Sequence, residues 1–159
     1  MDVAMRLVYA ITLSAFAKAH EDAKEIEDAL RALVPFDFEK EKLKVQVQNA
    51  EGFESTIRII TIQLTKVTHT NEVLKFLFGK LEPEQKDALK EQTESRLDES
   101  LDYFVRFDKT EWVNKRKLTL TDSGNCIHCK FALAVYPKKR EVAINLVHNL
   151  LESTNQKSI

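Results

Sequence analysis

Glycine, proline and cysteine are scarce in this sequence of 159 residues, which has three glycines, three prolines and two cysteines. So few glycines and prolines exclude collagen-like chains and flexible linkers, and two cysteines are too few for the disulfide framework of a small secreted domain. No run approaches about 18 consecutive apolar residues, so we expect no transmembrane helix. The abundant classes are apolar residues, at 43%, and charged residues, at 31%, a composition typical of a globular domain.

The N-terminal run has the hydrophobicity of a signal peptide, but Asp2 and Arg6 interrupt it. No small-residue cleavage site precedes a polar start, so we interpret the run as a strand. We expect no membrane partner, and because two cysteines are too few for a secreted disulfide framework, we expect a cytoplasmic protein. The length predicts one domain over 1–159, with its core at about 5–152 and a frayed tail at 153–159.

The net charge of −1 hides an uneven distribution of charge. Residues 103–140 contain nine Lys or Arg against three Asp or Glu, a local net charge of +6. The rest of the chain contains 15 Lys or Arg against 22 Asp or Glu, a net charge of −7. A basic segment of this kind can attract phosphates, although lysines also simply solvate loops and strand edges.

Apolar periodicity predicts the secondary structure. Leu7, Tyr9, Ile11 and Leu13 alternate as one face of a strand, whereas 21–34 has helical spacing. Turns are expected at Glu51-Gly52 and at 122–125. The full prediction is strands at 5–17, 43–49, 56–66, 101–108, 117–121 and 126–136, and helices at 21–34, 70–81, about 83–97 and from Pro137 onward. This order predicts an α+β fold, a largely antiparallel sheet with helices packed on one face.

Cys126 and Cys129 form a C-x-x-C motif, which chelates metal or cycles between redox states when it bends around a turn. Here the motif lies in an alternating strand, so the two side chains point to opposite faces and Cys129 joins the apolar side. No second pair of ligands accompanies it. We expect neither a metal nor any other cofactor.

Motifs for catalysis are missing. The sequence has no G-x-S-x-G, no P-loop and no dinucleotide-binding glycine motif. Its four histidines are scattered, and only His128 shares a strand face with a cation, Lys130. We expect that the protein is not an enzyme.

The segment 103–109 combines aromatic and basic residues on one strand. Phe104, Arg106 and Asp108 share one face, and Tyr103 lies on the other. Aromatic rings beside a guanidinium on a sheet hold unpaired RNA bases in several folds. The alternative is that one face belongs to the core and that Arg106 and Asp108 form an ion pair on the other.

Three cations, Lys138, Lys139 and Arg140, follow Pro137 in what the sequence predicts to be the first turn of a helix. The helix dipole disfavours cations at this end, where free N–H groups favour anions. A local rule broken without structural gain points to function. We interpret the segment as a phosphate site.

These two segments, with Arg96-Leu-Asp98 before them, resemble the archaeal family of RNA-binding proteins and predicted exosome subunits. The resemblance extends over about 5–152, with the elements in the same order. It implies a fold similar to that of the large-subunit ribosomal protein that binds 5S RNA. At 110–115 this chain departs from the family pattern, because it has a tryptophan and no glycine.

We therefore expect a non-catalytic RNA-binding protein, an accessory to archaeal RNA processing or the exosome, with contacts mainly to phosphates. The expected RNA-binding residues are Arg96, Arg106, Lys109, Lys138, Lys139 and Arg140, with base stacking by Phe104, Trp112 or Tyr136. One alternative is a protein-interaction or assembly module with little direct RNA affinity, which uses acidic surfaces at 21–28 and 82–99 or dimerises through a strand edge. The other is an enzyme of phosphoryl chemistry built on Arg106, Asp108 and Lys109.

Overall fold

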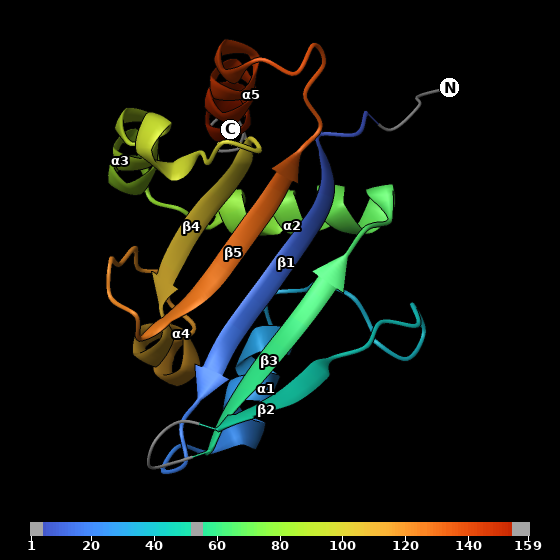
Figure 1. Ribbon diagram of the computed structural model, residues 1–159, viewed down its shortest axis with the longest axis vertical. Helices are drawn as coiled ribbons and strands as arrows, with labels where there is room; N and C mark the ends of the chain where they lie inside the picture. The colour runs from blue at the N-terminus through green and yellow to red at the C-terminus, as the bar shows by residue number, and fades with distance from the viewer. Residues whose placement is uncertain (1–4, 52–55, 154–159) are drawn as a thin grey trace. The chain divides into compact units, whose positions relative to one another are not determined.

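The computed structural model describes residues 5–51 and 56–153 (Figure 1). Its strands and helices follow the sequence order β-α-β-β-α-α-β-α-β-α. They are β1 (Val8–Ala17), α1 (Ala23–Arg31), β2 (Gln46–Glu51), β3 (Thr56–Leu64), α2 (Val67–Gly79), α3 (Pro83–Glu91), a short 3-10 helix η1 (Glu94–Arg96), β4 (Asp102–Asp108), α4 (Lys109–Lys115), β5 (Cys126–Leu133) and α5 (Arg140–Ser153).

The five strands form one sheet in the order β2-β3-β1-β5-β4. The arrows of β3 and β5 point opposite to those of β1 and β4, so the sheet is antiparallel (Figure 1). In the β2–β3 pair, Val47 lies opposite Ile60 and Asn49 opposite Arg58. The predicted α+β class with an antiparallel sheet is confirmed.

The chain divides into two compact units, each built from separate segments. The first unit contains Met1–Ile11, Leu64–Val105 and Lys130–Ile159, and the second contains Thr12–Gln63 and Arg106–Cys129. The prediction that 1–159 forms a single domain stays a prediction.

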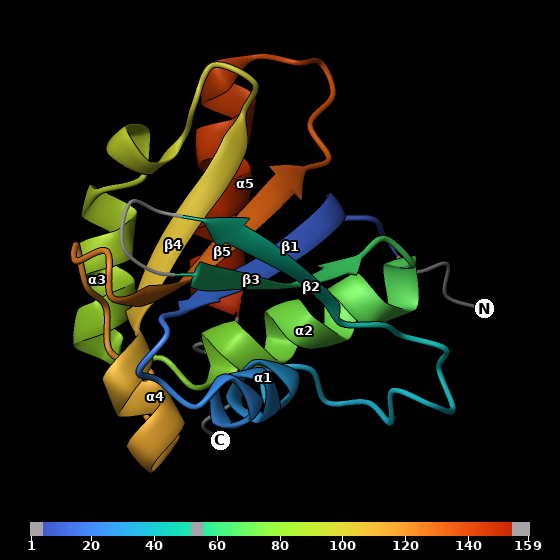
Figure 2. The same cartoon turned by 60° about the horizontal axis from the view of Figure 1, so that its bottom comes forward.

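The core of the first unit is aromatic where helix meets sheet. The ring of Phe131 on β5 lies 5.8 Å from that of Phe78 on α2 and 6.0 Å from that of Tyr103 on β4. All three side chains are buried. Helices α3 and α5 lie side by side in both views, and Lys90 forms an ion pair with Glu152 across them (Figures 1 and 2). Burial of one face of β4 and β5 thus leaves Phe104 and Lys130 on the other face.

The second unit packs α1 against α4 (Figure 2). Helix α1 begins at a true N-cap, because the Asp22 carboxylate accepts hydrogen bonds from the N–H groups of Lys24 and Glu25. It turns Ile26, Ala29 and Leu30 inward. This burial of one helical stripe is the amphipathic pattern that the sequence predicted over 21–34.

Helix α4 was not predicted, and its N-terminal signal is visible in the sequence. Asp108 is the N-cap, and its side chain accepts a hydrogen bond from the N–H of Glu111. Aspartate followed three residues later by glutamate is a recognised helix start.

The predicted strand at 117–121 is wrong. Only an isolated bridge joins Leu120 to Phe107, with hydrogen bonds from Asp108 N to Thr119 O and from Thr121 N to Arg106 O. This pairing is too short to count as a strand. The segment is instead the connection between α4 and β5. Alternation over five residues gives the right local periodicity without fixing a partner strand.

One helix boundary and the buried face of one strand are also corrected. The last helix begins at Arg140 rather than Pro137, so Lys138 and Lys139 precede it. On β1, Tyr9 is 56% exposed, whereas Ile11 and Leu13 are buried. The alternation of β1 slips by one residue after Val8, which is also buried.

Two predicted features fall on or beyond the edge of the described residues. Gly52 of the predicted turn lies outside them, and Glu51 belongs to β2. Most of the tail predicted to fray lies outside them as well.

Over 5–51 and 56–153, no helix has the length and apolar character needed to cross a bilayer. Within the same residues, no group of three or more His, Cys, Asp or Glu side chains could hold a metal ion.

Candidate nucleic-acid interface

The segment 136–139 is an exposed aromatic and basic stretch of the first unit. Tyr136 is 93% exposed, and Pro137, Lys138 and Lys139 are exposed. Neither ammonium forms an ion pair with any residue that the structure describes. The segment precedes the N-terminus of α5, where the Lys139 carbonyl accepts a hydrogen bond from the Ala143 N–H at 3.1 Å. Two unneutralised cations and a ring therefore stand beside the positive end of a helix.

Arg140 holds this segment in place and is largely engaged within the fold. Its guanidinium donates hydrogen bonds to the carbonyls of Glu94 at 2.6 Å, Leu97 at 3.1 Å and Asp98 at 3.3 Å. It also lies 3.6 Å from the Glu94 carboxylate. A guanidinium that satisfies three carbonyls at the end of η1 is a structural clamp, and the predicted contact of Arg140 with RNA stays a prediction.

Arg96 is also committed to internal contacts. It donates to the Gln92 side chain at 2.8 and 3.0 Å and to the carbonyl of Phe104 at 3.4 Å. Phe104 itself is half-buried on the uncovered face of β4. Lys130 lies on the corresponding face of β5 and pairs with Asp102 at 3.5 Å. In this unit, Arg96 therefore supports the uncovered face rather than projecting from it.

Two predicted site residues of the second unit are buried, and these predictions are corrected. Trp112 is 2% exposed, and its Nε1 donates to the carbonyl of Ala29 at 2.7 Å. Lys109 is 3% exposed and donates to the carbonyl of Phe16 at 2.7 Å and to Glu21 at 2.9 Å. A ring inside the core offers no face to a base, and an ammonium neutralised by a carboxylate offers no charge to a phosphate.

Hydrogen bonds keep the carboxylate of the Lys109–Glu21 pair in its charged form. Burial would raise the pKa of Glu21, but hydrogen bonds from the Lys18 N–H and the Lys109 ammonium lower this pKa below its ordinary value. Glu21 therefore stays ionised, and the pair joins the start of α4 to the loop that precedes α1.

Arg106 remains on the surface of the second unit, beside a hollow. Its guanidinium donates to the carbonyl of Asp122 at 3.3 Å. The hollow has a volume of about 360 Å³, and its lining includes Arg106, Phe16, Cys126 and His128. Phe16 is 51% exposed. Phe16 is not among the residues expected at the site, although the odd-numbered buried face predicted for this strand places an even-numbered residue on the opposite face.

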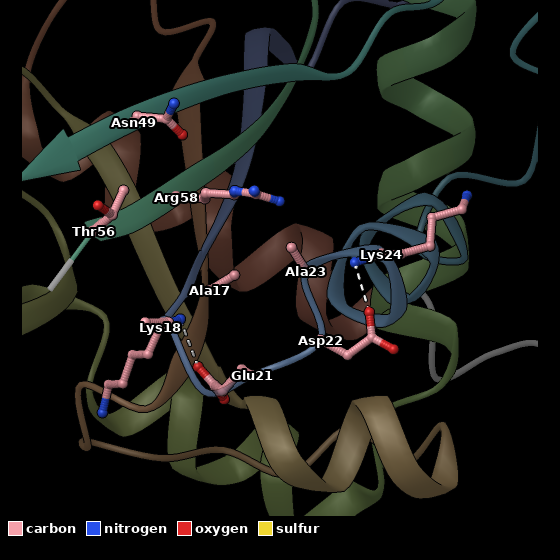
Figure 3. Close-up of a pocket in the computed structure, with 10 residues that line it drawn as sticks. Ala17, Lys18, Glu21, Asp22, Ala23, Lys24, Asn49, Thr56 and Arg58 are labelled. Carbon is pink, nitrogen blue, oxygen red and sulfur yellow. Dashed lines mark hydrogen bonds between the residues drawn. The ribbon is translucent and has the colours of Figure 1, made fainter.

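A second, larger hollow of the second unit surrounds the start of α1 (Figure 3). Its volume is about 550 Å³, and Arg58 of β3 points into it. The carboxylates of Glu21 and Asp22 lie on its wall, and Asp22 already occupies the first N–H groups of α1. The charges of this hollow are therefore mixed, and an anion would compete with the N-cap for its donors.

The two cysteines are free thiols. Cys129 is fully buried and Cys126 half-buried, which confirms that they point to opposite faces. Burial raises the pKa of both thiols. Both are therefore protonated and weakly nucleophilic at neutral pH.

The structure thus sorts the predicted site residues into two groups. The first unit brings Tyr136, Lys138 and Lys139 together in one exposed segment, with Arg96, Phe104 and Arg140 in or near its supports. The second unit contains Arg106 at its hollow, with Lys109 and Trp112 in its interior.

A family model described as RNA binding matches residues 10–133, most of the chain. The chain belongs to this RNA-binding family. Among its relatives is the protein named RNA-binding protein PAB1135 of Pyrococcus abyssi, which is 25% identical over 143 residues, covering 89% of this chain and 92% of the relative.

A second relative is the uncharacterized protein MJ0213 of Methanocaldococcus jannaschii, which is 24% identical over 139 residues, covering 85% of this chain and 91% of the relative. Among solved structures, protein AF2318 of Archaeglobus fulgidus, a DUF54 family member, has a TM-score of 0.76 at 25% identity, covering 91% of this chain and 98% of its own. A DUF54 protein of Methanothermobacter thermautotrophicus has a TM-score of 0.74 at 23% identity, covering 91% and 98%. These structures share the fold of this chain.

Proposed function

We propose that this protein is a non-catalytic RNA-binding module whose exposed segment 136–139 binds the sugar-phosphate backbone. The single observation that carries the proposal is the pairing of Lys138 and Lys139, both exposed and without a carboxylate partner among the described residues, with Tyr136, which is 93% exposed. Membership of the RNA-binding family and the name of the Pyrococcus abyssi relative support RNA binding, and the exposure and charge of 136–139 support this segment as the place of contact.

The chemistry of binding is mainly electrostatic. Each lysine that neutralises a phosphate releases condensed counterions, so affinity falls steeply as the salt concentration rises. Tyr136 adds a flat, accessible ring on which a base can stack. Because Arg140 fixes the end of the segment to η1, little chain entropy is lost when RNA binds.

The cellular role that we propose is that of a cytoplasmic accessory to an archaeal RNA-processing complex such as the exosome. One feature suits an assembly role, with a partner subunit or a second copy of the chain. Strand β2 ends the sheet, and its residues 46–49 are exposed, including Val47 at 49%. An open edge of this kind can accept another strand.

Fluorescence anisotropy with labelled single-stranded and duplex RNA, at about 50 and about 200 mM salt, tests the proposal. Wild-type protein is expected to bind about 10-fold or more weakly at the higher salt concentration. The variant Lys138→Glu/Lys139→Glu is expected to lose binding to both RNAs, with unchanged thermal stability because both side chains are exposed.

The matched control is Lys40→Glu/Lys44→Glu, which makes the same change of charge on two exposed lysines of the second unit. It is expected to lower the affinity much less. Equal losses in the two double variants would show that net charge alone governs binding and would overturn the assignment to 136–139. A wild-type protein that binds neither RNA would overturn RNA binding and favour the assembly role.

A further inference from the structure

The hollow beside Arg106 has the residue composition of a binding site for a small planar ligand. Its volume of about 360 Å³ lies at the lower end of the range of about 300–1,000 Å³ that small-molecule sites occupy. It is lined on one side by Ser14, Ala15 and Phe16 of β1, and on the other by Cys126 and His128 of β5, with Arg106 of β4. Its lining thus combines one aromatic ring with small side chains and with the polar groups of Ser14, Arg106 and His128.

Phe16 is the unexpected member of this surface. A phenylalanine on the uncovered face of a strand is unfavourable in water, yet this ring is 51% exposed. Its neighbours along β1, Ala15 and Ala17, are buried, so the exposure belongs to Phe16 alone and not to a frayed strand end. An exposed ring over a hollow is suited to stacking against a planar ligand.

Arg106 supplies the matching polar group. One N–H of its guanidinium is engaged by the Asp122 carbonyl, which fixes the side chain while leaving further donors of its fork. A guanidinium plane beside an aromatic ring is a recurring arrangement for bases of unpaired RNA, because both can stack and the guanidinium can also donate to base edges or to phosphate.

Hydrogen bonds from two sides hold the hollow in its shape. The Lys109 ammonium donates to the carbonyl of Phe16 at 2.7 Å and is itself held by Glu21. The end of β1 that carries the ring is therefore tied to the start of α4. The Asn125 side chain donates to Thr110 at 3.0 Å and ties the loop before β5 to the same helix. A preformed site loses little entropy on binding.

We propose that this hollow is a pocket for one unstacked nucleobase of single-stranded RNA, with Phe16 as the stacking platform and Arg106 as the rim donor. The proposal rests on the proposed function and deepens it, because it names unpaired RNA as the preferred substrate class. Duplex RNA keeps its bases stacked inside the helix, so it cannot use the pocket.

The first test compares Phe16→Ala with wild type in binding to single-stranded and duplex RNA. Loss of a stacking platform is expected to weaken single-strand binding about 5- to 30-fold while leaving duplex binding unchanged. Phe16→Trp is expected to restore single-strand affinity, because it replaces the ring. Tyr9→Ala, which removes a similarly exposed ring near the start of β1, is the control and is expected to change neither affinity.

The second test uses Cys126 as a reporter in the full chain. Cys126 lines the hollow, whereas Cys129 is fully buried, so iodoacetamide at a pH of about 9 modifies Cys126 first. Single-stranded RNA is expected to slow this alkylation severalfold, and duplex RNA is expected not to. Adenosine monophosphate at millimolar concentration probes the pocket without the rest of the RNA and is expected to slow it too.

The outcomes separate the two proposals. If RNA binds but Phe16→Ala binds both RNAs as tightly as wild type and no RNA protects Cys126, the pocket is overturned and the proposed function stands. If wild type binds no RNA while adenosine monophosphate still protects Cys126, the proposed function fails and base recognition by the hollow is supported. Equal loss of both RNAs in a Phe16→Ala variant whose thermal stability is unchanged would also overturn the pocket, because Phe16 would then not discriminate unpaired bases from duplex RNA.

Discussion

The ammonium of Lys109 donates a hydrogen bond of 2.7 Å to the backbone carbonyl of Phe16, and both residues belong to the second unit. Together with the ion pair to Glu21 at 2.9 Å, this bond gives a lysine of the basic segment a structural role inside the fold. The cation that we expected at the RNA surface instead anchors a strand end that carries an exposed ring.

Replacement of Lys109 by methionine is expected to destabilise the protein by about 1–3 kcal/mol, because the Phe16 carbonyl and the Glu21 carboxylate lose their donor. Methionine keeps most of the buried volume, so little of the loss comes from a cavity. Urea denaturation measures the free energy of unfolding. Lys115→Met on the same helix is the control, because Lys115 is exposed and its 3.5 Å ion pair with Glu111 is worth about 0–1 kcal/mol. Equal stability of the two variants would contradict a stabilising role for the contacts of Lys109.

The Glu21 carboxylate makes the stability of this unit depend on pH. Its pKa is lowered in the folded protein, so its contribution to stability is present above the ordinary value of 4.5 and is lost as the pH falls through the folded value. The free energy of unfolding of wild type is expected to fall more steeply than that of Glu21→Gln between about pH 5 and about pH 3. Parallel curves for the two proteins would show that the carboxylate is not stabilised by its partners.

Trp112→Phe separates a core role from base stacking. The indole donates to the carbonyl of Ala29, one of the last-turn carbonyls of α1, so its loss leaves a buried acceptor unsatisfied. We expect a destabilisation of about 1–3 kcal/mol in urea denaturation, with no change in RNA affinity measured at a temperature where both proteins are folded. Weaker RNA binding at unchanged stability would restore the stacking role that the sequence suggested.

Arg140 and the lysines before it are expected to fail in different ways. Arg140→Lys removes the planar fork that serves three carbonyls, so we expect a loss of about 0.5–1.5 kcal/mol in stability and a smaller loss of RNA affinity. Lys138→Gln/Lys139→Gln is expected to do the reverse, because both side chains are exposed. Thermal melting and anisotropy measured on the same samples distinguish them. A common pattern in both variants would contradict the division between clamp and contact residues.

Most of the secondary structure could be predicted from the sequence, because periodicity reports which side of an element is buried. The helix at α1, the strands β3 to β5 and the opposite orientations of Cys126 and Cys129 follow from spacing alone. Helix α4 could have been predicted from Asp108 and Glu111. The strand expected at 117–121 could not be tested by spacing, because a strand exists only when a partner pairs with it.

For the site, the sequence by itself determined which residue types are available: a basic C-terminal third, aromatic residues within it, and a Tyr-Pro-Lys-Lys segment. Only the tertiary structure decided which of these charges are free. Lys109, Arg96 and Arg140 carry the same charge as Lys138, yet their donors are satisfied by carbonyls and side chains distant in sequence. Residue type fixes a charge, but the availability of that charge to a ligand depends on burial and on partners, which the folded chain brings together.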